Sequence, residues 1–232
     1  MLEVENLSVS YGAVRALEDV TLSAAAGSTT AVLGANGAGK SSLLRAISGI
    51  APVSAGRIRL EGRDVTALPP QARAKLGLAH AMEGRRLFKQ MTVEENLRLA
   101  WSFGARAAPL PRALEEVYAR FPILAEKART ASGLLSGGQQ QMVILSCTTI
   151  RSPRVLLLDE PSLGLAPIIV RQIYAFISDF ARDSGATVVI SEQMATVALK
   201  VADHGVALRR GRVVRAGTSR ELLGSSLAEA YL

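Results

Sequence analysis

The stretch Gly34-Ala35-Asn36-Gly37-Ala38-Gly39-Lys40-Ser41 decides the fold class of this chain. It follows a short β-prone run at 29–33, and leucine and isoleucine recur at helical spacing through 41–48. Glycines let the backbone between a strand and a helix curl, so that consecutive N–H groups point inward at phosphate oxygens. The helix that follows adds its positive N-terminal end. The sequence therefore predicts a phosphate-binding loop in a strand–loop–helix unit.

Two residues of this loop carry the chemistry of a nucleoside triphosphate site. Lys40 supplies a charge for the β- and γ-phosphates, and the hydroxyl of Ser41 is placed to ligate Mg²⁺. A chance glycine-rich turn is the alternative, and the strand before the loop and the helix after it argue against that alternative. The predicted nucleotide contacts of this loop are Gly34, Ala35, Asn36, Gly37, Ala38, Gly39, Lys40, Ser41 and Ser42.

A second segment ends in two adjacent carboxylates. Residues 155–158 form a short apolar run typical of a buried strand, and Asp159 and Glu160 follow it directly. We expect Asp159 to hold Mg²⁺, directly or through water, and Glu160 to orient or deprotonate the attacking water. A solvated strand end is the alternative for two carboxylates in this position.

A third segment, Leu135-Ser136-Gly137-Gly138-Gln139, is a second glycine-rich turn before a helix. A serine followed by two glycines at that point predicts a second anion-binding helix N-terminus. A simple helix cap is the alternative. One chain should not need two such sites for one γ-phosphate.

In the order in which they occur along the chain, residues 34–41, 135–139 and 155–160 resemble the Walker A, signature and Walker B motifs of ATP-binding cassette (ABC) ATPases. The resemblance runs over nearly the whole chain, and residues 161–165 resemble the D-loop of that family. It implies an α/β fold, the ABC nucleotide-binding domain, with a RecA-like core, an antiparallel β portion and a helical subdomain. We expect the core at about residues 1–83 and 151–232 and the helical subdomain at about residues 84–150.

The resemblance also implies how the site is assembled. In the family the signature motif serves the nucleotide held by a partner subunit, so two chains enclose two ATP molecules head to tail. The residues that would contact the partner's ATP are Ser136, Gly137, Gly138 and Gln139.

Three further positions are matched one by one. Tyr11 stands where the family has an aromatic residue that stacks on adenine; a partly buried tyrosine at a strand end is the alternative. Gln193 replaces the usual switch histidine, and its amide can donate to the γ-phosphate but cannot shuttle a proton. The proton-accepting role therefore falls on Glu160. Glu83 replaces the Q-loop glutamine, and its carboxylate can touch Mg²⁺ or water.

These replacements look like one subgroup of the family. The Glu-Gly-Arg Q-loop at 83–85, the Glu-Gln switch at 192–193 and the Ser-Leu-Gly-Leu-Ala-Pro D-loop at 162–167 resemble the ATPase subunit of branched-chain amino acid importers. Close relatives of that subunit serve importers of urea, amides and aromatic acids. The ending of the chain, residues 221–232, fits the same subgroup.

Two departures from the subgroup pattern stand out. Met82 occupies a place where proline is usual, and Cys147 occupies the place of an arginine on the helix after the signature motif. The loss of that large cation is expected to weaken contacts around the nucleotide. A cassette with impaired hydrolysis, acting as a nucleotide-gated structural partner, is therefore one alternative, although an intact Glu160 argues against it.

The resemblance implies the ATP-hydrolysing subunit of an importer, peripheral on the cytoplasmic face of the inner membrane, with ATP and Mg²⁺ as cofactors. The implied partners are two transmembrane permease subunits, a second cassette (a paralogue or a second copy) and, indirectly, an external solute-binding protein. A soluble ABC ATPase that acts on nucleic acid or ribosomes is the alternative function. Such proteins usually carry two cassettes or long coiled coils, and this sequence has neither.

Composition agrees with these expectations. The 232 residues carry a net charge of +7, and the basic residues are scattered rather than gathered in a run. Aromatic residues for base stacking are sparse, so we expect no nucleic-acid partner. No apolar stretch approaches the roughly 18–20 residues that a membrane-spanning helix needs. The acidic start is not a signal peptide, and the single cysteine suits a reducing compartment.

Neither histidine has the spacing of a metal site, and both His80 and His204 are expected to be structural. Trp101 and Phe103 are expected to pack the helical subdomain or to face a membrane partner.

Beyond the strand–loop–helix unit, the pattern predicts a largely parallel sheet covered on both faces. The other expected elements are strands at 2–9, 20–22, 155–158, 187–190, 206–208 and 213–214, a hairpin near 56–64, a break at 69–70, helical periods from 92 to 149 and a helix at 167–181.

Overall fold

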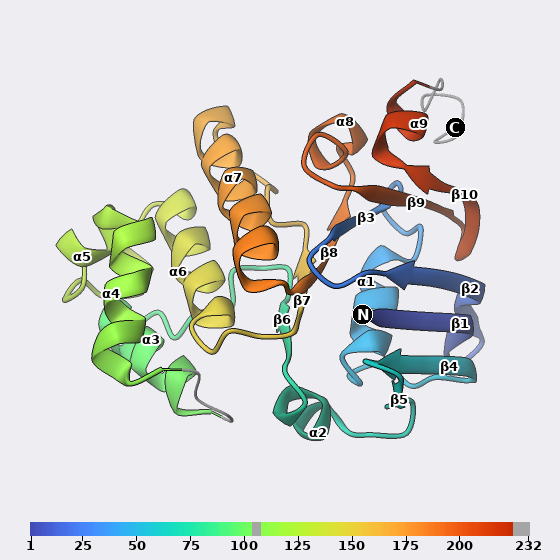
Figure 1. Ribbon diagram of the computed structural model, residues 1–232, viewed down its shortest axis with the longest axis horizontal. Coiled ribbons are helices and arrows are strands. Elements are labelled where there is room, and N and C mark those ends of the chain that lie inside the picture. The colour runs from blue at the N-terminus through green and yellow to red at the C-terminus, as the bar shows by residue number, and fades with distance from the viewer. Residues whose placement is uncertain (104–107, 225–232) are drawn as a thin grey trace.

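The computed structural model describes residues 1–103 and 108–224, and it places two β-sheets beside a group of helices (Figure 1). The smaller sheet is antiparallel, with the strand order β2-β1-β4-β5. Its side chains alternate between buried and exposed along β1, as predicted for a half-buried strand. The strands are β1 (Leu2–Tyr11), β2 (Val14–Ala24), β4 (Ala55–Leu60) and β5 (Arg63–Asp64).

The larger sheet has the order β10-β9-β3-β8-β7-β6, in which only the β9–β10 pair is antiparallel. Every residue of β3 and β7 is buried, which is typical of parallel strands covered on both faces. Because the strands are parallel, the carboxyl ends of β3, β8 and β7 meet at one edge of the sheet. The strands are β3 (Thr29–Leu33), β6 (Leu78–Ala81), β7 (Val155–Asp159), β8 (Thr187–Glu192), β9 (His204–Arg209) and β10 (Arg212–Thr218).

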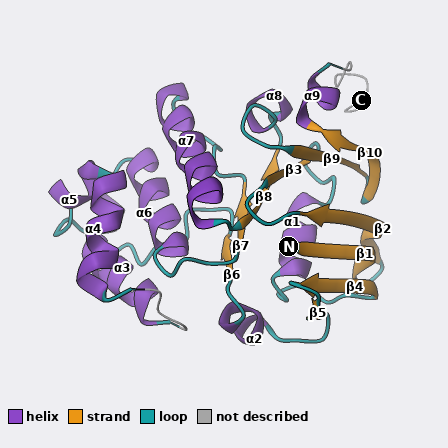
Figure 2. Ribbon diagram, viewed as in Figure 1, coloured by secondary structure: helices purple, strands orange, loops and turns teal. Residues whose placement is uncertain are grey.

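Each face of this sheet has its own apolar core. Leu157 and Val189 point to one face, where they pack with α1 (Lys40–Ile47) and the antiparallel sheet. Leu156 and Leu158 point to the other face, where they pack with α6 (Gly137–Thr149) and α7 (Pro167–Ser184). Figure 2 shows α6 and α7 on one side of β7 and β8, and α1 with the antiparallel sheet on the other. The expectation of a parallel sheet covered on both faces is confirmed.

The helical part lies where helical periods were predicted. Its buried side chains, such as Leu97 and Leu124, belong to the same apolar cluster as Leu158 of the sheet. The helices therefore share a core with the sheet rather than closing one of their own. Besides α6, the elements are α3 (Val93–Ser102), α4 (Leu110–Arg120), α5 (Pro122–Glu126) and a 3₁₀ turn (Ser132–Leu134).

Some elements were missed. The break expected at Pro69-Pro70 is instead the start of α2 (Pro70–Lys75), because proline fits the first helical turn, where its missing N–H leaves no bond unmade. Strand β6 is short, lies at the sheet edge and pairs only with β7. The short helices α8 (Ala195–Ala198) and α9 (Ser219–Leu223) were also not predicted.

The ending at 221–232 was compared with the importer subgroup, and residues 225–232 of it lie outside the described residues. Within the described ranges, no helix has the length and apolar character to cross a membrane.

Candidate nucleotide-binding site

The carboxyl ends of three neighbouring strands bring the predicted catalytic segments together. Leu33 at the end of β3 pairs with Glu192 of β8, and Asp159 at the end of β7 pairs with Ser191 of β8. The glycine loop therefore leaves the sheet beside the two carboxylates, although about 120 residues separate them in the sequence. This edge is where an open parallel sheet places a ligand.

The glycine loop has the geometry of a phosphate cradle. Gly39 has a φ of +107°, and a Cβ there would lie 2.7 Å from Leu17 Cδ2 and 2.8 Å from the Ala16 carbonyl oxygen. No side chain therefore fits this position without displacing β2. No side chain caps the start of α1, and no acidic residue lies in its first turn. The N-terminal N–H groups of α1 are thus not engaged by a side-chain cap and are suited to an anion.

Lys40 and Glu160 meet at the centre of the site. The ammonium of Lys40 lies 3.1 Å from Glu160 Oε1, and the two side chains are only 4% and 10% exposed. The same ammonium donates to the carbonyl oxygens of Gly34 (2.8 Å) and Ala35 (3.2 Å). Burying two charges is costly unless each compensates the other. The Glu160 carboxylate and the loop carbonyls are therefore the partners that hold Lys40.

Asp159 has one bonded and one unpartnered carboxylate oxygen. Its Oδ1 accepts hydrogen bonds from Ser41 Oγ (3.0 Å) and Ser191 Oγ (2.5 Å). Its Oδ2 is buried and has no hydrogen-bond partner among the described residues. A buried polar atom without a partner calls for an explanation. A hydroxyl beside a carboxylate oxygen is the kind of donor set that Mg²⁺ takes, so Ser41 and Asp159 fit this ion.

The backbone is strained where Glu160 leaves β7. Glu160 has a φ of +48°, which is unusual for a residue with a side chain. Its N–H donates to the carbonyl oxygen (3.1 Å) and the Oγ (3.2 Å) of Ser191, which keeps the chain in this conformation. Gln193 lies exposed just after β8, one residue beyond Glu192. The switch position therefore follows the strand that also supports Asp159 and Glu160.

Glu192 is a buried carboxylate that was not among the predicted site residues. It is 3% exposed, and its Oε1 accepts bonds from Ser162 N (3.2 Å), Ser162 Oγ (2.7 Å) and Tyr174 Oη (2.7 Å). Burial first, and then this carboxylate, raise the pKa of Tyr174 well above its usual value, which keeps the phenol protonated as a donor. The signals in the sequence were the Glu-Gln switch at 192–193 and a carboxylate two residues after the buried strand run at 187–190.

The signature residues lie apart from the Lys40 cluster. Ser136 and Gln139 cap α6 reciprocally: Gln139 N–H donates to Ser136 Oγ (3.3 Å) and Ser136 N–H donates to Gln139 Oε1 (3.0 Å). The helix cap that the sequence left as an alternative is thus present. Among the described residues, no hydrogen bond or ion pair joins residues 136–139 to the glycine loop or to Glu160. A second chain is needed if both segments are to contact one nucleotide.

Two other predicted contacts lie at the surface. Tyr11 ends β1 with 42% of its surface exposed, which leaves its ring accessible. Glu83 is exposed and, within the described ranges, forms no hydrogen bond or ion pair with Ser41, Asp159 or Glu160. The structure therefore does not bring Glu83 into the metal cluster. The adenine contact of Tyr11 and the metal contact of Glu83 stay predictions.

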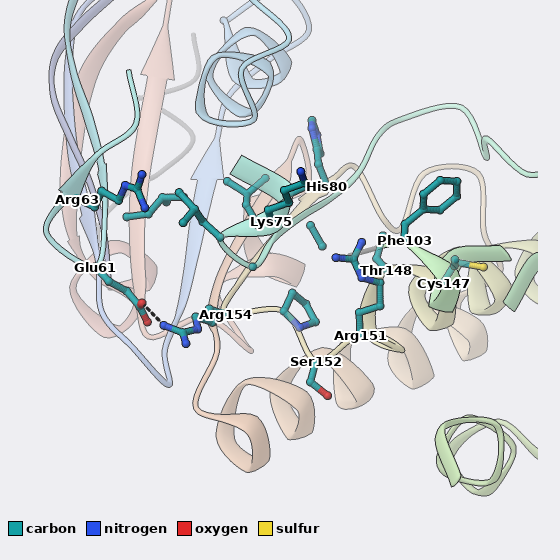
Figure 3. A pocket seen from close by; sticks show the side chains of 18 residues that line it. Glu61, Arg63, Lys75, His80, Phe103, Cys147, Thr148, Arg151, Ser152 and Arg154 are labelled. Carbon is teal, nitrogen blue, oxygen red and sulfur yellow. Dashed lines mark hydrogen bonds and ion pairs between the residues drawn. The ribbon is translucent and has the colours of Figure 1, made fainter. Parts of the chain in front are cut away.

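Cys147 lies in a separate cavity of about 780 Å³, shown in Figure 3. None of the predicted nucleotide contacts lines this cavity, so any weakening of nucleotide contacts by Cys147 would have to be indirect. Arg151, four residues later, lines the same cavity. Burial raises the pKa of Cys147 to about 12 and lowers that of His80 to about 4. Both side chains are half-buried, and a neutral ring agrees with the expectation that His80 is structural.

Comparison with known proteins finds close similarity over the full chain. A family model described as ABC transporter matches residues 17–163. The chain is 40% identical to BraG of Pseudomonas aeruginosa, a high-affinity branched-chain amino acid transport ATP-binding protein, over 100% of this chain and 99% of that protein. It is 36% identical to LivF of Archaeoglobus fulgidus, a probable branched-chain amino acid transport ATP-binding protein, over 96% and 94%.

Solved structures show the same likeness. The ATP-binding subunit of an ABC transporter superimposes with a TM-score of 0.84 at 30% identity, over 99% of this chain and 97% of that chain. A nucleotide-free ATP-binding cassette from an ABC transporter gives a TM-score of 0.85 at 26% identity, over 98% and 95%. The fold predicted from the three segments is confirmed.

Proposed function

Because this chain belongs to the ABC transporter family, as one of its ATP-binding cassettes, we propose that it hydrolyses ATP to drive a membrane importer of branched-chain amino acids or a related small solute. The observation that carries the proposal is the cluster of Lys40, Asp159 and Glu160 beside an uncapped helix N-terminus. The solute is inferred from BraG and LivF, whose names specify branched-chain amino acid transport.

The residues divide the work of hydrolysis as follows. A bound Mg²⁺ would neutralise phosphate charge, and Ser41 and Asp159 would hold it. Lys40 exchanges its contacts with Glu160 and the loop carbonyls for the β- and γ-phosphate oxygens, since these bring a larger negative charge. Glu160 is then free to orient a water molecule and to accept its proton. Gln193 donates an amide hydrogen bond to the γ-phosphate, a role that needs no proton transfer.

A second cassette completes the site in this proposal. Among the described residues the signature turn, which caps α6, has no hydrogen bond or ion pair with Lys40, so its anion-binding end serves a nucleotide on a partner arranged head to tail. Closing and opening of this pair would move two permease subunits, supplied with solute by an external binding protein. Phe88 and Phe103 are 62% and 60% exposed, and these apolar side chains support a protein partner on the surface that they share. This assembly would place the chain on the cytoplasmic face of the inner membrane.

Affinity capture from gently solubilised native membranes tests the transport assignment. We expect the tagged chain to recover two hydrophobic permeases and a second cassette. A variant with Phe88 and Phe103 both changed to serine is expected to recover less permease while still binding ATP, since neither residue is a predicted nucleotide contact. Recovery of ribosomes or nucleic acid without a permease would overturn the transport assignment and leave the ATPase.

A further inference from the structure

The loop at residues 161–165, between β7 and α7, is fixed at its start by a buried carboxylate. Glu192 accepts hydrogen bonds from both the backbone N–H and the hydroxyl of Ser162. Glu192 directly precedes Gln193, the predicted γ-phosphate contact. The start of the loop is therefore tied to the segment that would sense this chain's own nucleotide.

The end of the same loop is fixed by Arg85. Its Nη2 donates to the carbonyl oxygens of Leu163 (3.2 Å) and Gly164 (3.3 Å). Arg85 lies two residues after Glu83 and has a φ of +48°, a conformation that residues with side chains rarely adopt. Strained residues of this kind persist where surrounding contacts enforce them, and they cluster at functional sites.

The guanidinium of Arg85 also lies against the start of α6. A Cβ added to Gly137 would sit 2.4 Å from Arg85 Nη1, so the guanidinium lies close against the backbone at Gly137. A cation at a helix N-terminus faces the positive end of the helix dipole, which is unfavourable. The carbonyls of Leu163 and Gly164 compensate for that repulsion. Arg85, which ends the turn at 83–85, thus contacts two other segments, the 161–165 loop and the signature turn.

We propose that Arg85 is a positioning residue. It couples the nucleotide site of its own chain to the 161–165 loop and the signature turn, the segments that face the nucleotide bound by a second cassette. The proposal rests on the head-to-tail pair of the proposed function. A phosphate at the N-terminus of α6 attracts the guanidinium and weakens its hold on Leu163 and Gly164. Glu192 keeps Ser162 in place, so the far end of the loop moves relative to its start. Occupation of one site thereby alters the geometry at the other.

Hydrogen exchange of the nucleotide-free protein tests the first link. In Arg85→Ala, amides of the 161–165 loop are expected to exchange about tenfold faster than in the wild type, because the loop end loses its anchor. Arg85→Gln, which keeps much of the side-chain volume, is expected to behave in the same way. The matched control is Arg86→Ala, since Arg86 is exposed and forms no hydrogen bond or ion pair within the described part of the chain. Wild-type protection of the loop in Arg85→Ala would overturn the proposal.

ATP turnover as a function of ATP concentration tests the coupling itself. The wild type is expected to give a sigmoidal curve; Arg85→Ala is expected to give a hyperbolic one with kcat lowered about tenfold and ATP affinity unchanged. Arg85→Lys keeps the positive charge but not the planar set of N–H donors of the guanidinium, and it should recover part of the kcat lost in Arg85→Ala. Wild-type kcat and cooperativity in Arg85→Ala would contradict the coupling. If the wild-type chain forms no ATP-dependent pair, the proposed assembly fails, while the exchange experiment still decides whether Arg85 holds the loop.

Discussion

Individual residues of the site are held in a resting arrangement by the groups that the nucleotide would replace. Lys40 is paired with Glu160, and Asp159 is bonded through one oxygen while the other has no partner among the described residues. A phosphate and a metal ion offer each of these groups a better partner. Burying these charges costs free energy, and this free energy is regained when a phosphate and a metal ion bind.

His80 gives the protein a predictable dependence on pH. Burial lowers its pKa from 6.5 to about 4, and its Nδ1 lies 3.0 Å from Ser48 Oγ. Because the folded state disfavours the protonated ring, the unfolded chain binds the proton first as the pH falls. The resulting stability is present above pH 6.5 and is lost as the pH falls towards 4. Between pH 7 and pH 5 we expect urea denaturation to show a loss of about 2 kcal/mol in the free energy of unfolding.

The control for His80 is His80→Phe, which keeps an aromatic ring but cannot ionise. Its unfolding free energy is expected to fall less between the same two pH values. An equal fall in the variant and in the wild type would assign the pH dependence to other groups.

At the scale of elements, the glycine loop and α1 act as one unit. The loop leaves β3, turns at Gly39 and starts a helix whose first N–H groups are not capped by a side chain. Anion binding thus comes from how the strand, loop and helix follow one another, and it needs few side chains.

Gly39→Ala is the prediction at this scale. The new Cβ would be forced into a φ of +107° and would meet Leu17 and the Ala16 carbonyl at under 3 Å. We expect a loss of about 2–4 kcal/mol in the free energy of unfolding, together with weaker ATP binding. Gly37→Ala is the matched control: its φ is +79°, and an added Cβ there meets nothing within 4 Å. It should cost only about 1 kcal/mol. Equal unfolding midpoints for the two variants would contradict the steric argument.

At the scale of the whole molecule, the described chain presents two half-sites that do not meet. The Lys40 cluster lies at the sheet edge, and the signature turn lies at the start of α6 among the helices. Both half-sites are used only if two cassettes pair head to tail. Binding energy from ATP then becomes relative motion of the two chains.

Glu160→Gln separates pairing from hydrolysis. The amide is nearly the same size as the carboxylate but cannot accept the proton from water, so ATP should bind and remain intact. We expect size-exclusion chromatography with ATP to show a stable pair for the variant, whereas the wild type returns to single chains as it hydrolyses ATP. A rate of ATP hydrolysis equal to that of the wild type would remove the proton-accepting role from Glu160.

The sequence by itself determined the parts of this protein that local chemistry specifies. The glycine loop predicted β3 and α1, the apolar run before Asp159 predicted β7, and the three segments in order predicted the family. These features depend on neighbouring residues, because glycine freedom, helix spacing and strand burial can all be read over a few positions.

Only the tertiary structure decided which distant groups meet. The pairing of Lys40 with Glu160, the burial of Glu192 against Ser162 and the reach of Arg85 to Gly164 all depend on strand order and on loop conformation. Sequence spacing does not encode such contacts, since residues about 30 to 120 positions apart become neighbours only when parallel strands align their ends. The fold class could therefore be predicted from short motifs, whereas the connections between those motifs required the packed chain.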